Sequence, residues 1–158
     1  MSAIARNLGN VLSLVKKACL EHSRKVPVRL CAVSKFKPAT DIQAAYDCGQ
    51  RHFGENYVQE LVSKAPELPK DINWHFIGHL QSNKCKLVAA IDNLFVVETV
   101  DKPSLAKALN KACKKVGRAE PLNILVQVSE FGVVNKQATG SGTVEGSLAC
   151  CTYLSVYG

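Results

Sequence analysis

A lysine at the end of an apolar run is the residue of this sequence with the clearest chemical potential. Residues 28–34 read VRLCAVS, and Lys35 follows them directly. A nearly continuous apolar run predicts a strand buried on both faces of a parallel sheet. Ligands bind at the carboxyl ends of such strands, so we expect Lys35 over a pocket and partly out of water. An amine there attacks an aldehyde more readily, and imine formation is the predicted chemistry. The alternative is a solvated loop charge, which is the role expected for Lys37.

Two further segments place polar side chains at predicted strand ends: HFGENYVQE at 52–60 and HFIGHLQSNK at 75–84. Taken singly, their residues have simpler structural roles. Asn56 and Ser82 are expected to cap helices, and Glu55 to be a surface charge. Only the combination of the two segments with the lysine strand favours a binding site.

No metal site is predicted. His75 and His79 lie on the same face of a predicted strand, but the sequence offers no third ligand near them. The seven cysteines form no CxxC pair, and several lie at apolar positions. They are therefore expected to be reduced core residues of an intracellular protein.

Strands and helices alternate along the predicted chain. After the run at 28–33, strands are expected at 51–57, 74–80, 94–100 and 122–128, with a helix between each pair. A strand every 20 to 28 residues or so is typical of βα units in a right-handed parallel sheet. Helix ends carry their own signals: Thr40 and Asp101 as caps, Pro103 in a first turn, and Gly49 and Gly117 as terminators.

The N-terminal segment has two interpretations. Its first 20 residues contain no acidic group, as in a mitochondrial transit peptide. We favour a structural helix, because apolar residues recur there at helical spacing: Ile4, Leu8, Val11, Leu12 and Val15. A cytoplasmic location is accordingly expected, with the mitochondrion as the alternative.

Size and charge narrow the class of protein. A chain of 158 residues with 47% hydrophobic content is long enough for one domain with a proper core, and no run is long enough to cross a bilayer. A net charge of +7 suits an anionic partner, either a phosphorylated cofactor or a nucleic acid. Because the basic residues are dispersed and no nucleic-acid motif occurs, nucleic-acid binding is not expected.

Together and in this order, the three segments resemble the pyridoxal 5'-phosphate (PLP) homeostasis proteins. AVSKFKP is similar to the family's lysine strand, RHFGENYVQE to its second-strand signature and WHFIGHLQSNK to its third. With the initial helix and the fifth strand, the resemblance covers about residues 4–129. It implies an α/β fold, a TIM-barrel-like fold-type III PLP barrel, here incomplete with about five βα units.

The resemblance also implies the site. Lys35 would form the Schiff base with PLP, Asn56 would lie beside the cofactor, and His79, Gln81 and Asn83 would surround the pocket mouth. The implied function is PLP binding and intracellular PLP homeostasis without turnover of its own, by a protein that is monomeric in the family. The alternative is a PLP-dependent racemase of the alanine racemase fold, which would need a second acid/base that this segment lacks.

The sequence departs from the family after the fifth strand. Residues 1–129 are expected to form a partial PLP-binding barrel, and residues 130–158, rich in Gly, Ser and Thr, a divergent and poorly ordered tail. The departure resembles a truncated product that lacks the segments holding the cofactor phosphate. Loss of the phosphate contacts is then expected to weaken PLP binding, and open barrel edges are expected to favour self-association.

Overall fold

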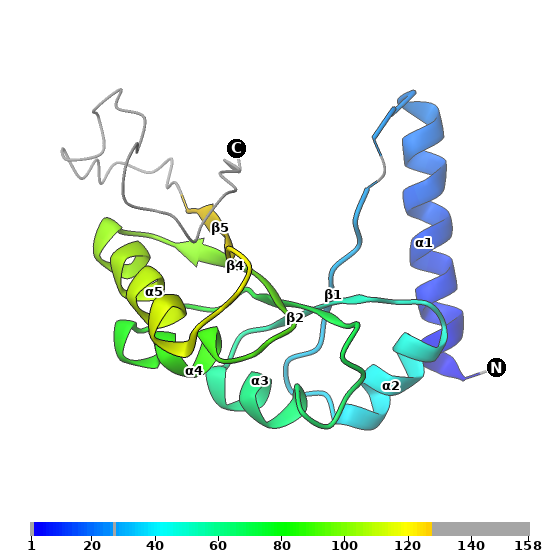
Figure 1. Ribbon diagram of the computed structural model, residues 1–158. Coiled ribbons are helices and arrows are strands. Elements are labelled where there is room, and N and C mark those ends of the chain that lie inside the picture. Colours follow the sequence, from blue (N-terminus) through cyan, green and yellow to red (C-terminus); the bar gives the residue numbers. More distant parts are fainter. Residues whose placement is uncertain (1, 27, 128–158) are drawn as a thin grey trace.

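The computed structural model describes residues 2–26 and 28–127, and within them five parallel strands form one sheet (Figure 1). The strands are β1 (Ala32–Val33), β2 (His52–Glu55), β3 (Asn73–Phe76), β4 (Leu94–Val100) and β5 (Asn123–Val126). The helices are α1 (Ala3–Glu21), α2 (Ala39–Asp47), α3 (Val58–Lys64), α4 (Cys85–Ala89) and α5 (Pro103–Val116), with a 3₁₀ turn, η1, at Ser82–Lys84. The predicted division at residue 129 and the predicted tail at 130–158 lie outside the described residues.

The strand order β1-β2-β3-β4-β5 follows the sequence without reversal. A doubly wound sheet reverses its order at a switch point and therefore has helices on both faces. Right-handed crossovers between strands in sequential order place every connecting helix on the same face. Figure 1 shows α2 to α5 along one side of the sheet. The predicted TIM-barrel-like α/β fold with about five βα units is confirmed.

The core lies between the sheet and these helices. Phe53, Trp74 and Phe76 point to the helix side and are at most 1% exposed. Helices α3 and α5 bring Leu61 and Leu109 against them, both fully buried. This packing fixes the strands from which the polar segments extend.

The prediction for the first strand is wrong in extent and in burial. Only Ala32–Val33 is hydrogen-bonded as a strand, while Val28 is 43% exposed and Val33 54%. Among the described residues, β1 has β2 as its only neighbour. A strand paired on one side receives only half the backbone hydrogen bonds and half the covering that its apolar sequence suggests.

Helix α1 confirms the predicted N-terminal helix and is capped by Ser2, whose hydroxyl accepts a hydrogen bond from the Ala5 amide. Of its predicted apolar stripe, Ile4 and Leu8 pack on the core, whereas Val11 and Leu12 remain 42% exposed. Across residues 2–26 and 28–127, none of the helices combines the length and the apolarity that crossing a bilayer requires.

Four helices begin without the predicted side-chain caps. The N-cap residues are Pro38, Tyr57, Gln81 and Lys102, none with a side-chain capping bond, in place of Thr40, Asn56, Ser82 and Asp101. The predicted glycine terminators are correct. Gly49 (φ 96°) and Gly117 (φ 72°) adopt left-handed conformations that a side chain would strain.

Candidate functional site

Lys35 lies in a tight turn directly after β1. The Lys37 amide donates to the Ser34 carbonyl at 3.1 Å, which closes the turn around Lys35 and Phe36. Phe36 has φ 60°, a positive value that turns of this kind usually assign to glycine or asparagine. Lys35 itself is exposed, so the expected partial burial of its amine is not observed among the described residues.

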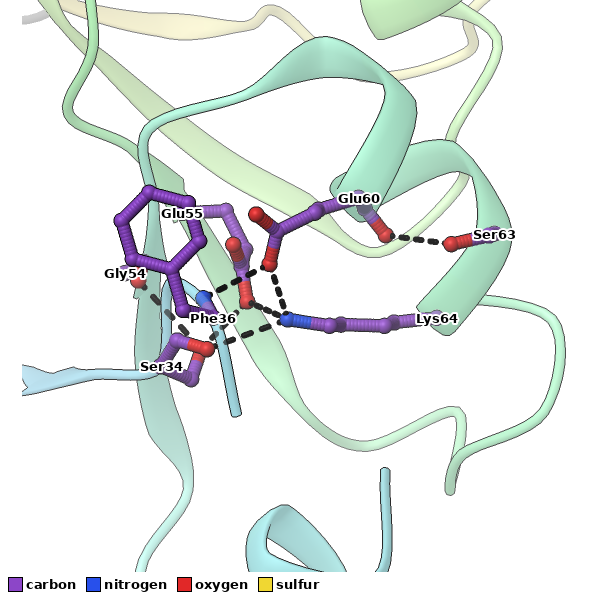
Figure 2. Close-up of polar contacts among 7 residues, drawn as sticks. All are labelled: Ser34, Phe36, Gly54, Glu55, Glu60, Ser63 and Lys64. Carbon is purple, nitrogen blue, oxygen red and sulfur yellow. Dashed lines mark hydrogen bonds and ion pairs between the residues drawn. The ribbon is translucent and has the colours of Figure 1, made fainter. Parts of the chain in front are cut away.

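A buried lysine from α3 lies under this turn (Figure 2). Lys64 is 8% exposed, and its ammonium donates to Glu55 Oε1 at 2.8 Å, Glu60 Oε2 at 2.6 Å and the Ser34 carbonyl at 3.0 Å. Its three N–H donors thus have three acceptors, two of them carboxylates. We call Ser34, Glu55, Glu60 and Lys64 the helix-side cluster.

The two carboxylates of the helix-side cluster also reach the turn (Figure 2). The Ser34 hydroxyl donates to Glu55 Oε1 at 2.7 Å, and the Phe36 amide donates to Glu60 Oε2 at 2.9 Å. The Phe36 ring packs on Tyr57 with centroids 5.2 Å apart. Both neighbours of Lys35 in the chain are therefore held by β2 and α3.

Two members of the helix-side cluster, Glu60 and Lys64, are stabilised in their charged forms. The hydrogen bond from Lys64 holds the pKa of Glu60 below its usual value. Burial alone lowers the pKa of Lys64, but the hydrogen bonds and charges of Glu55 and Glu60 outweigh it, and the net direction is upward. Lys64 therefore stays protonated, and an ammonium is not a nucleophile. Chemistry at an amine falls to the exposed Lys35.

A small pocket of about 190 Å³ opens beside the end of β2. Asn56, His79 and Gln81 line it, together with Tyr57 and Lys84. The Oδ1 atom of Asn56 is buried and has no hydrogen-bond partner in the described structure.

The structure thus brings together three of the predicted site residues. Two others, Lys35 and Asn83, do not line the pocket and are exposed.

Gly78 allows this end of β2 to approach the segment that follows β3. A Cβ atom at position 78 would lie 2.0 Å from the Asn56 carbonyl oxygen, which real structures never show. The backbones therefore meet only because residue 78 lacks a side chain. This contact sets Asn56 beside the segment that carries His79 and Gln81.

A second polar cluster lies on the opposite face of the sheet. His75 Nδ1 donates to Glu98 Oε1 at 2.5 Å, and His75 Nε2 is 2.9 Å from His52 Nδ1. Ligand atoms of Cys31, His75 and Glu98 lie within 4.8 Å of one another. Because both ring nitrogens of His75 already have partners, we assign these residues a hydrogen-bonding role. Cys31, His52, His75 and Glu98 are called the inner-face cluster.

Burial disfavours the charged forms of two residues in the inner-face cluster, His52 and Cys31. Burial, with smaller electrostatic contributions from His75 and Arg29, lowers the pKa of His52 to about 4. Burial, with the charge of Glu98, raises the pKa of the Cys31 thiol to about 12. His52 is therefore a neutral imidazole and Cys31 a neutral thiol near pH 7.

Sequence reasoning missed the helix-side cluster. Glu55 was expected to be a surface charge, and this is wrong, because it is fully buried. Two signals were present. Glu55 follows the core residue Phe53 by two positions, so the two side chains point to the same face of the strand. Glu60 precedes Lys64 by one helical turn. These signals indicate a core-facing Glu55 in the strand and, separately, a Glu60–Lys64 pair on the helix.

No protein-family model matches the chain. A pyridoxal phosphate homeostasis protein of Schizosaccharomyces pombe is 43% identical over 125 residues, which make up 79% of this chain and 52% of that protein. Its human counterpart is 44% identical over 130 residues, covering 77% and 47%. The chain spans about half the length of the curated relatives it matches.

A solved structure has the same fold. PipY of Synechococcus elongatus, in a structure with PLP bound, is 36% identical and superposes with a TM-score of 0.59. The match covers 74% of this chain and 55% of PipY.

Proposed function

Because this chain belongs by sequence and fold with the pyridoxal phosphate homeostasis proteins, of which it spans about half the length, we propose that it binds PLP and serves intracellular PLP homeostasis. The observation that supports this most directly is the turn at Lys35. It sets one exposed amine at the carboxyl end of a parallel strand, while the neighbouring buried lysine is neutralised by two carboxylates.

The residues at this end of the sheet fit such a ligand. Asn56 Oδ1 is a buried acceptor without a partner in the described structure, and it borders a pocket that His79 and Gln81 also line. A buried polar atom without a partner costs about 1 to 3 kcal/mol, which a ligand with a hydrogen-bond donor would recover. The hydroxyl of PLP, and its ring nitrogen when protonated, are donors of this kind.

We assign Lys35 the covalent contact, Asn56 a polar contact beside the cofactor, and His79, Gln81 and Asn83 the rim of the site. When bound, PLP supplies an aldehyde that condenses with an amine. The chain's own part is to present the exposed amine of Lys35 and to hold Lys64 in its ion pairs with Glu55 and Glu60. Binding and containment of a reactive aldehyde require no further acid or base, so we expect no turnover.

The remaining expectations form part of the same proposal. Residues 1–129 carry the PLP site, and the protein acts in the cytoplasm, with the mitochondrion as the alternative. Nucleic acid and membranes are not partners. Size-exclusion chromatography with light scattering distinguishes the monomer typical of the family from the self-association expected of open sheet edges.

Lysine mapping tests the proposal. The protein is incubated with PLP, reduced with borohydride and analysed by peptide mass spectrometry, with Lys35→Ala as the test variant. Lys37→Ala, two residues away in the same exposed segment, is the matched control. Label should concentrate on Lys35, disappear in Lys35→Ala and persist in Lys37→Ala. Equal labelling of Lys35, Lys37 and Lys84 would reject Lys35 as the site.

A further inference from the structure

Every strong contact around Lys35 is made to its two neighbours in the chain. Ser34 is bound by Lys64 and Glu55, and Phe36 by Glu60. We propose that Glu55, Glu60 and Lys64 are positioning residues, which fix the turn so that the Lys35 amine has one orientation. This inference rests on the proposed function of Lys35.

The first half of the turn is fixed through Ser34, which is 4% exposed. Its amide donates to the Gly54 carbonyl at 2.9 Å, and its hydroxyl donates to Glu55 at 2.7 Å. Its carbonyl accepts from Lys64 at 3.0 Å and from the Lys37 amide at 3.1 Å. The amide, carbonyl and hydroxyl of Ser34 are all hydrogen-bonded. These bonds fix the orientation of the peptide group that joins Ser34 to Lys35.

The second half is fixed through Phe36 against its own preference. A bulky residue at φ 60° is strained by roughly 1 to 3 kcal/mol, and the chain would relax if nothing opposed this. The Glu60 carboxylate opposes it by accepting the Phe36 amide proton. Because 72% of the Phe36 residue is exposed, packing contributes little there, and the hydrogen bond is the main restraint.

Lys64 joins the two halves. It donates to the Ser34 carbonyl on one side of Lys35 and to Glu60, which holds Phe36, on the other. Glu55 is fully buried and carries a charge that Lys64 compensates. A cluster that only stabilised the fold would have no reason to meet the chain on both sides of one exposed lysine.

The test removes the restraint on Phe36. Glu60→Ala deletes the acceptor, Glu60→Gln keeps an amide oxygen in its place, and Glu21→Gln is the matched control in an exposed i,i+4 pair with Lys17. Amide exchange at Phe36, measured without PLP, should rise about tenfold or more in Glu60→Ala. It should rise less in Glu60→Gln and stay unchanged in Glu21→Gln. The share of borohydride-fixed PLP on Lys35 should fall in the same order.

Phe36→Gly supplies the second measurement. Glycine adopts positive φ without cost, so the turn should form without Glu60. Lys35 labelling in Phe36→Gly and in Phe36→Gly/Glu60→Ala should then agree within about twofold. A tenfold difference between these two variants would overturn the proposal, as would wild-type exchange and labelling in folded Glu60→Ala.

The two proposals fail in different ways. If Lys35 is unlabelled in the wild type while Phe36 exchange still responds to Glu60→Ala, the positioning role stands and the PLP function fails. If Lys35 is labelled equally in all variants, the PLP function stands and the positioning role fails.

Discussion

The helix-side and inner-face clusters occupy opposite faces of the same strands and handle charge in opposite ways. Along β2, Glu55 points to the helices while His52 points to the other face. The helix-side cluster favours the charged forms of Glu60 and Lys64 by pairing them. The inner-face cluster keeps an imidazole and a thiol neutral by burying them.

The difference teaches what each cluster can do. Paired charges resist titration across the neutral range and suit a fixed support for the Lys35 turn. In the inner-face cluster, the neutral imidazole of His52 takes up a proton only as the pH falls toward 4, whereas the Cys31 thiol stays neutral in acid. Substitutions in the two clusters should therefore change stability by different amounts.

Lys64→Met should be the most destabilising single change. It removes the cation beside Glu55, which is fully buried. An uncompensated buried charge costs about 3 to 5 kcal/mol. Urea unfolding at neutral pH measures the loss. Glu55→Gln/Lys64→Met, which removes both charges, should recover most of it. If the free energy of unfolding of Lys64→Met were within about 1 kcal/mol of the wild-type value, Lys64 would not be compensating a buried charge.

His75→Leu should cost less, about 1 to 3 kcal/mol. It fills the buried site with an apolar group but leaves Glu98 Oε1 without its ring donor. Glu98 is half-buried and can turn to water, which the fully buried Glu55 cannot. The same urea measurement compares the two clusters. If His75→Leu lost more stability than Lys64→Met, the inner-face cluster would contribute more to stability than the helix-side cluster.

The pH dependence of stability should show two windows. The pKa of His52 is about 4 in the folded chain, below its ordinary 6.5. Between these two pH values the imidazole is protonated in the unfolded chain and neutral in the folded chain. Stability should fall as the pH drops from about 6.5 to 4, by on the order of 1 kcal/mol after solvent screening. Glu60, with a lowered pKa, adds its own loss only as the pH falls below its unfolded value of 4.5. His52→Asn should flatten the first window and leave the second; urea midpoints across the range measure both.

Alkylation of Cys31 should have the smallest consequence. With a pKa of about 12, its thiolate is scarcer than that of an ordinary cysteine by roughly three orders of magnitude near pH 8. Exposed Cys48 is the internal control. Iodoacetamide and mass spectrometry should label Cys48 first and leave native Cys31 and the thermal midpoint unchanged. Equal rates at the two cysteines would contradict the neutral inner-face cluster.

The sequence predicted elements best where local and tertiary preferences agree. β4 has the predicted bounds, 94–100, because its apolar run is paired on both sides. Helix α5 begins at Pro103 and ends before Gly117, both fixed by backbone geometry. The strand at 28–33 was overestimated, since pairing on one side is a property of the sheet and not of the run.

The candidate site was predictable only in part. The polar segments were found because they lie at strand ends, and Asn56, His79 and Gln81 do border one pocket. The support of Lys35 was missed because its contacts join residues 21 to 30 positions apart. Periodicity describes one element at a time and cannot show that a carboxylate in a strand faces an ammonium in the following helix.

The left-handed Phe36 has a consequence for the order of folding. Its conformation is unfavourable in isolation and depends on Glu60, which follows it by 24 residues in the chain. The turn therefore acquires its shape only after α3 has docked on β2, and a nascent chain that ends before α3 has no such turn. Pulse-labelled amide exchange should find Phe36 protected no earlier than the β2 strand. The turn that carries Lys35 is thus expected to be among the last parts of this region to be set in place.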